Sequence, residues 1–90
     1  MNTTSLSIRE QIHARLTERL QPSVLTVLDE SAAHAGHAGA NADGQGSHIR
    51  VCIASPLFAP LSRVQRHRLV YDALQDFIDQ GLHALAIELI

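Results

Sequence analysis

The chain has 90 residues, a length that gives a single domain, and 46% of them are apolar. Aromatic residues make up 3%, so we expect a small core built from Leu, Ile, Val and Ala. The single cysteine excludes an internal disulfide, and the polar opening MNTTSLSIRE predicts neither a secretory signal nor a membrane span, so we expect a cytoplasmic protein. The net charge of −2 argues against a surface that grips nucleic acid throughout.

The first predicted element is a helix over about residues 7 to 20. Ser7 and Glu10 have the spacing of a capping box. Apolar residues then recur at four-residue intervals: Ile8, Ile12, Leu16 and Leu20. Pro22 cannot continue the helical hydrogen bonding, and a first strand is predicted from Val24 to Asp29.

Residues 31 to 47 are rich in Ala, Gly, Asn, Asp and Ser, which predicts a loop. We expect this loop to be mobile and residues 1–6 to be disordered within a single domain spanning 1–90. With His48, the stretch reads SAAHAGHAGANADGQGSH and holds three histidines. An imidazole in such a segment has a purpose if something binds it, and costs little if it is simply solvated.

The second half of the chain predicts a strand, a helix and a further strand. HIRVCIAS alternates apolar and other residues as a half-buried strand does, and PLFAPL after it predicts a connection or a single turn. Ser62 and Gln65 repeat the capping-box spacing at the start of a helix predicted over about 62 to 80. Gly81 is placed to end that helix, and LHALAIEL predicts the third strand.

This order of elements predicts an α+β fold, a two-layer sandwich with helices on one face of a three-stranded mixed sheet. If the first two strands pair antiparallel and a crossover helix makes the third parallel to the second, their ends meet at one rim. The four histidines expected at that rim are His34, His37, His48 and His83.

Two imidazoles at one rim form half of a site for zinc, copper, nickel or iron, which needs further ligands from elsewhere. The spacing HAGH matches no established metal motif. The alternative is that the loop histidines are solvated and that His83 bonds to backbone at a strand end.

Other chemistry-bearing residues favour structural roles. His67 is expected to pack on the apolar side of the second helix, and Cys52 to fill space on the strand face that carries Arg50, although a free thiol there could react. No nucleophile lies beside a histidine on a predicted turn and no pair of buried carboxylates is predicted, so we do not expect an enzyme.

Arg63, Arg66 and Arg68 crowd the start of the second helix and could meet phosphate. The alternative is a solvated face, with Arg68 partly engaged by Asp72 four residues later.

Several segments together resemble the BolA-like family over about residues 8 to 89. They are VLDES, HAGHAG, SHIRVCIAS, LSRVQRHRLVYDAL and the closing HALAI. The fold of that family, related to the class II KH arrangement, agrees with the order of elements predicted above.

The resemblance implies a function beyond what spacing can predict. Family members bind monothiol glutaredoxins of the CGFS type, and the pair can hold a bridging [2Fe-2S] cluster for iron-sulfur trafficking or iron sensing. The resemblance assigns His83 as one metal ligand and His34 as the loop ligand, with His37 as the alternative. Glutaredoxin and glutathione thiolates would supply the rest, so no cofactor is expected in the isolated protein.

Some members of the family have been assigned transcriptional regulation of stress response and cell shape. For this chain the resemblance would then imply DNA binding by the second helix, through Arg63, Arg66 and Arg68.

Overall fold

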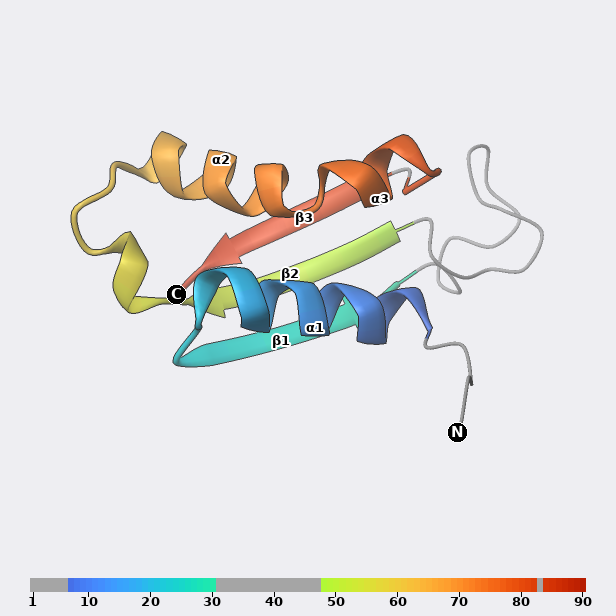
Figure 1. Ribbon diagram of the computed structural model, residues 1–90, viewed down its shortest axis with the longest axis horizontal. Coiled ribbons are helices and arrows are strands. Elements are labelled where there is room, and N and C mark those ends of the chain that lie inside the picture. The colour runs from blue at the N-terminus through green and yellow to red at the C-terminus, as the bar shows by residue number, and fades with distance from the viewer. Residues whose placement is uncertain (1–6, 31–47, 83) are drawn as a thin grey trace.

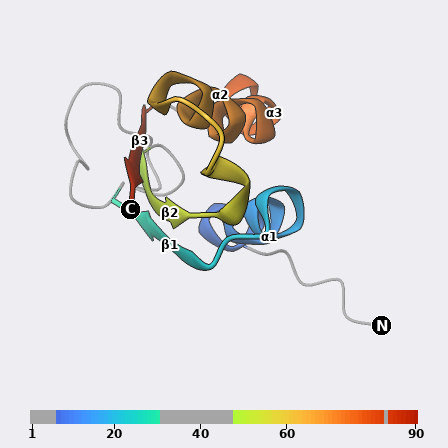
Figure 2. The ribbon, with the colours of Figure 1, turned by 90° about the vertical axis from the view of Figure 1, so that its left-hand side faces the viewer.

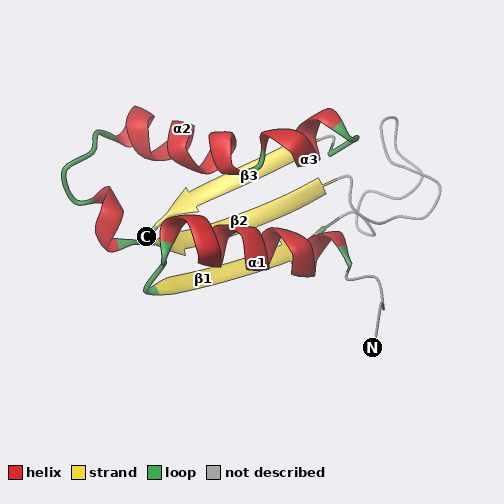
Figure 3. Ribbon diagram, viewed as in Figure 1, coloured by secondary structure: helices red, strands yellow, loops and turns green. Residues whose placement is uncertain are grey.

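The computed structural model describes residues 7–30, 48–82 and 84–90, which form helices, strands and one 3-10 turn (Figures 1 and 3). In chain order these elements are α1 (Ile8–Leu20), β1 (Val24–Asp29), β2 (His48–Ala54), the 3-10 turn η2 (Pro56–Phe58), α2 (Arg63–Ala73), α3 (Gln75–Asp79) and β3 (Ala84–Leu89).

The three strands form one mixed sheet in the order β1-β2-β3. β1 pairs antiparallel with β2, so that Val24 lies opposite Ala54 and Asp29 opposite Ile49. β2 pairs parallel with β3, and His48 lies opposite Ala84. All the helices cover one face of the sheet, as Figure 2 shows edge-on. We call this the inner face, and the face turned away from the helices the outer face. The predicted α+β sandwich with a three-stranded mixed sheet is confirmed.

The core lies between the inner face and the helices. Alternation along β2 sends every second side chain inward, and a four-residue interval along α1 gathers one apolar stripe against them. The buried residues are Ile12, Leu16, Leu20, Val27, Ile49, Val51, Ile53, Phe58, Val70, Ala73, Leu74, Phe77 and Leu82. The predicted aliphatic core is therefore confirmed, with two phenylalanines at its margins.

Both predicted capping boxes are present. Ser7 Oγ accepts from the Glu10 amide at 3.1 Å and Glu10 Oε1 accepts from the Ser7 amide at 3.0 Å. Ser62 Oγ and Gln65 Oε1 make the same reciprocal pair at the start of α2. Each box satisfies amides that the first helical turn leaves without a partner, which fixes where α1 and α2 begin.

The prediction of a single helix over 62–80 is wrong, because the helix is interrupted at Leu74. That residue leaves helical geometry (φ −113°, ψ 10°) and separates α2 from the five-residue α3. Leu74 is fully buried, so the break is used to bring a large apolar side chain into the core. No Gly or Pro stands at the break, which is why the sequence pattern predicts a continuous helix.

A tight link joins α3 to β3. Gly81 has φ 123°, a conformation that L side chains rarely adopt, and no heavy atom lies within 4 Å of where its Cβ would be. Glycine is therefore required here by backbone geometry and not by space. Among the described residues, no helix is long and apolar enough to cross a membrane.

Candidate metal centre

The sequence predicts a metal site at the edge of the sheet where β1 ends. Glu30, which follows β1, donates its amide to the His48 carbonyl at the start of β2, at 2.8 Å. Ala84 opens β3 directly beside His48. The end of one strand and the starts of two others therefore meet within two strand spacings, about 10 Å. We call this the histidine edge; it lies on the right in Figure 1.

All three predicted ligands lie outside the described residues. His34 and His37 belong to 31–47, and His83 stands alone between Leu82 and Ala84. The backbone on either side of each gap is described, and all of it ends at the histidine edge. His48 is the histidine whose predicted place at this rim is confirmed, as the first residue of β2.

The chain enters β3 from a buried position. Leu82 is 7% exposed and donates its amide to the Phe77 carbonyl at 3.1 Å, while Gly81 donates to the Ile78 carbonyl at 3.2 Å. These two hydrogen bonds tie the entry to β3 onto the end of α3. Leu82, the described residue before β3, is therefore attached to the helical layer.

Charge on the outer face is organised around one arginine. Arg50 pairs with Glu30 through Nε at 3.1 Å and with Glu88 through Nη1 at 2.6 Å, which links all three strands. The hydrogen bonds to these carboxylates raise the pKa of Arg50 above its usual value. Glu30 at the histidine edge is thus already engaged by this chain's own cation.

The thiol is not at the histidine edge. Cys52 lies in the middle of β2, opposite Thr26 of β1 and Glu88 of β3. Cys52 comes four positions after His48 in the strand, a distance of about 13 Å at roughly 3.3 Å per residue. Partial burial raises the pKa of the Cys52 thiol, and the negative charge of Glu88 raises it further. Its predicted place on the face that carries Arg50 is confirmed.

The other described histidines stand apart. His67 is half-buried on α2, in line with the packed role predicted for it, and His13 is exposed on α1. In the parts of the chain that the structure describes, no group of three or more His, Cys, Asp and Glu side chains is arranged to hold a metal ion.

The three arginines at the start of α2 do not form one basic surface. Arg66 is half-buried and donates Nε to the Leu61 carbonyl at 2.9 Å, whereas Arg63 and Arg68 are exposed. Two residues along a helix turn through about 200°, so Arg66 and Arg68 leave α2 on nearly opposite sides. The expected Arg68–Asp72 pair is wrong: both residues are described, and no ion pair joins them. The start of α2 lies at the end of the molecule away from the histidine edge (Figure 1).

One long-range contact between two helices has no signal in the sequence. Arg15 of α1 reaches across to α3, bonding Asp76, which is 61 residues away along the chain. A charged residue at this helix position predicts only exposure, and no local spacing points to so distant a partner.

Both the sequence and the fold of this chain are similar to those of known proteins. A family model described as BolA-like protein matches residues 16–90. A Sinorhizobium sp protein named "Uncharacterized protein in cobS 5'region" is 48% identical over 84 residues, covering 92% of this chain and 89% of that protein. SufE-like protein 1, chloroplastic/mitochondrial, of Arabidopsis thaliana is 45% identical over 80 residues, which are 86% of this chain and 22% of that protein. The solved structure of BolA1 from Arabidopsis thaliana has a TM-score of 0.82 at 38% identity, covering 96% of this chain and 93% of that one.

Proposed function

Because the chain belongs to the BolA-like family, we propose that it is a non-enzymatic adaptor that binds a monothiol glutaredoxin of the CGFS type and shares a [2Fe-2S] cluster with it. His83 is one ligand of the cluster, and His34 or His37 is the second. We also propose that the protein acts in the cytoplasm, as the sequence predicts.

The observation that carries the proposal is the meeting of chain ends at the histidine edge. The segment that holds His34 and His37 leaves the described structure at Glu30 and returns at His48, and these two residues are hydrogen-bonded to each other. The gap that holds His83 opens at Ala84, beside His48. The described backbone on both sides of these histidines therefore ends at one edge, which supports a proposal in which two of them bind one iron.

The donor set fits a shared cluster better than a site of this chain alone. Imidazole nitrogen binds iron well, but [2Fe-2S] clusters also use thiolates. The only cysteine of the chain lies about 13 Å from the histidine edge, on the outer face of β2. Thiolates must therefore come from a partner, and glutaredoxin with glutathione would supply them.

Histidine ligation suits a cluster that is handed on. With imidazole in place of thiolate at one iron, the reduction potential of a [2Fe-2S] cluster is higher, and protonation of the imidazole competes with the metal. The edge itself contributes a backbone that is hydrogen-bonded on both sides of the ligand positions, so two imidazoles can be presented together. Cluster transfer and iron sensing both need such a labile end.

The test is a titration of the whole chain with cluster-loaded monothiol glutaredoxin, followed by visible circular dichroism. We expect a new spectrum for the wild type and its loss, or at least about tenfold weaker binding, for His83→Ala. His34→Ala and His37→Ala, singly and together, identify the loop ligand. His13→Ala, an exposed histidine of α1, is the matched control and should change nothing. A spectrum that His83→Ala leaves unaltered would contradict the ligand assignment.

DNA binding through α2 is the weaker alternative. Arg66 is tethered to the Leu61 carbonyl and leaves the helix on the opposite side from Arg68. If the alternative holds, Arg63→Ala and Arg68→Ala each lower the slope of log affinity against log salt by about one.

A further inference from the structure

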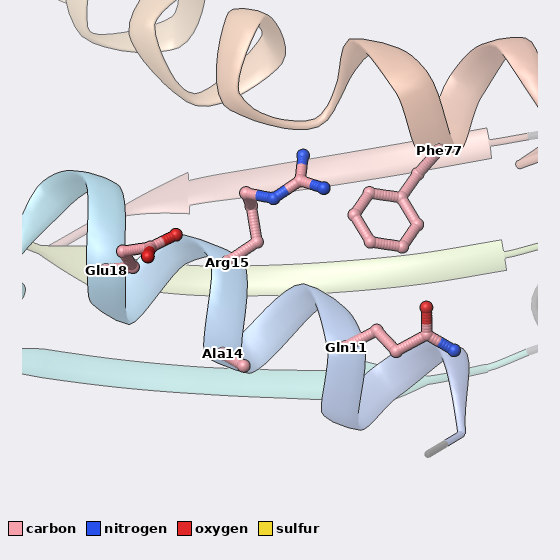
Figure 4. Close-up of a pocket in the computed structure, with 5 residues that line it drawn as sticks. All are labelled: Gln11, Ala14, Arg15, Glu18 and Phe77. Carbon is pink, nitrogen blue, oxygen red and sulfur yellow. The ribbon is translucent and has the colours of Figure 1, made fainter. Parts of the chain in front are cut away.

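Arg15 of α1 contacts α3 through both its charge and its planar face. Its Nη1 and Nη2 bond the two carboxylate oxygens of Asp76 at 2.6 and 2.9 Å, and Nη1 also donates to the Ala73 carbonyl at 2.9 Å. The guanidinium carbon lies 4.9 Å from the centre of the Phe77 ring. Figure 4 shows Arg15 and Phe77 pointing toward each other beside a hollow of ≈ 350 Å³, which they line together with Gln11, Ala14 and Glu18 of α1.

These contacts reach a short helix that has no side-chain cap. α3 has only five residues, and Leu74 before it supplies no side-chain cap. A helix this short is not stable by itself, because forming the first turn costs more than its few hydrogen bonds return. Arg15 bonds the last carbonyl of α2 and the first acidic side chain of α3, and so bridges the break at Leu74. Three of its contacts are directed hydrogen bonds, two of them to a charged oxygen, which makes the bridge specific in geometry.

The same part of α3 holds the entry to β3. Phe77 lies under the Arg15 guanidinium, is 7% exposed, and accepts the Leu82 amide on its carbonyl at 3.1 Å. Leu82 is the last described residue before position 83. A continuous set of contacts therefore runs from Arg15 through Phe77 to the backbone at the histidine edge.

We infer that Arg15 is a positioning residue for the metal centre: it holds α3 against α1 and thereby fixes the backbone that leads into His83. This inference rests on the proposed function. Arg15 is about 20 residues from the nearest predicted ligand in sequence and lies in the helical layer, and its role in this inference is exerted through its contacts with α3.

Arginine is the residue that this role requires. The planar guanidinium bonds both oxygens of Asp76 while a further N–H reaches the Ala73 carbonyl, and its face lies over an aromatic ring. Lysine keeps the charge but cannot make the bidentate pair. The comparison of Arg15→Gln with Arg15→Lys therefore separates charge from geometry, and Arg19→Gln, an exposed arginine near the end of α1, removes equal charge without contacting α3.

The first measurement uses the isolated chain and does not depend on the proposed function. In amide hydrogen exchange, we expect Arg15→Gln to speed exchange of the Leu82 and Gly81 amides by about tenfold, Arg15→Lys by less, and Arg19→Gln not at all. The Val51 and Ile53 amides of the central strand should keep their rates. Equal acceleration at every amide would reduce Arg15 to a general stabilising role, and an unchanged Leu82 rate would also overturn the inference.

The second measurement adds cluster-loaded monothiol glutaredoxin and records visible circular dichroism. We expect Arg15→Gln to weaken formation of the shared cluster by about tenfold or to change its spectrum, with partial recovery in Arg15→Lys. Wild-type affinity and spectrum in Arg15→Gln would overturn the inference. If the wild type itself gives no spectral change, the proposed function fails, whereas the exchange rates still report whether Arg15 holds the entry to β3.

Discussion

On the inner face of the sheet, β2 contributes Ile49, Val51 and Ile53, each no more than 2% exposed. On the outer face the same strand contributes Arg50 and Cys52, both half-buried. Outer-face residues of β1 are more open still, since Val24 is 47% exposed and Leu28 is 45% exposed. Side chains on the two faces of β2 therefore differ in burial: those on the inner face are apolar and buried, whereas those on the outer face include a charged residue and a thiol.

The difference teaches where this small protein keeps its stability. Apolar area removed from water lies almost entirely between the inner face and the helices, and at about 25 cal/mol per Å² this burial is the main favourable term. The outer face holds its side chains by ion pairs that water and salt reach, and such pairs stabilise little. Substitutions on the two faces should therefore have effects of different size and different salt dependence.

The largest effect is expected from Ile53→Ala on the inner face. Ile53 is fully buried, so truncation loses its transfer free energy and leaves a cavity, which together cost about 2–5 kcal/mol of unfolding free energy. Urea unfolding followed by far-ultraviolet circular dichroism measures the change. Cys52→Ala, one position away on the outer face, is the matched control and should unfold close to the wild type. Equal losses for the two variants would show that the outer face is buried in solution.

A smaller effect is expected from Arg50→Gln. The variant removes both outer-face ion pairs, with Glu30 and with Glu88, but these groups are a third to a half exposed. The loss of stability should be well below that of Ile53→Ala and should shrink as the salt concentration rises from about 0.05 to 0.5 M. Thermal unfolding at the two salt concentrations measures it. A loss that salt does not reduce would mean that Arg50 acts by packing.

The smallest effect is expected in the reactivity of the Cys52 thiol, with no change in the stability of the protein. Burial and the charge of Glu88 raise the pKa of the Cys52 thiol, so at each pH less of it is the reactive thiolate. Its alkylation rate, followed by mass spectrometry between about pH 7 and 10, should rise at higher pH than that of free cysteine. Glu88→Gln removes the negative charge and should move the curve back toward lower pH. No movement in that variant would leave burial as the only cause.

Local signals were sufficient to predict most of the fold. Ser7 with Glu10 and Ser62 with Gln65 fix two helix starts within their own first turns, and the alternation around Val51 defines the central strand. The break at Leu74 could not be predicted in this way. Ala73, Leu74 and Gln75 all favour helix, and the interruption comes from packing Leu74 into the core and from the bonds that Arg15 makes across 58 and 61 residues.

Some features of the candidate site could likewise be predicted from the sequence, and others could not. Strand order and direction predict that the loop after β1 and the starts of β2 and β3 lie at one end of the sheet, and the strand pairing confirms that the end of β1 and these two starts meet there. The choice between His34 and His37 depends on residues outside the described ranges, and it stays a prediction. The contacts of Arg15 could not be predicted from the sequence, because Asp76 and Phe77 belong to α3 and packing determines where α3 begins.

The alternation along β3 has a consequence for the neighbouring edge. Leu85, Ile87 and Leu89 pack against the core, while Ala84, Ala86 and Glu88 face the other way. A slip of one residue past β2 would bring a carboxylate among aliphatic side chains, so hydrophobic burial locks the strand lengthwise. Burial of these aliphatic side chains thus fixes the register of β3 against β2, and with it the position at which β3 begins at the histidine edge.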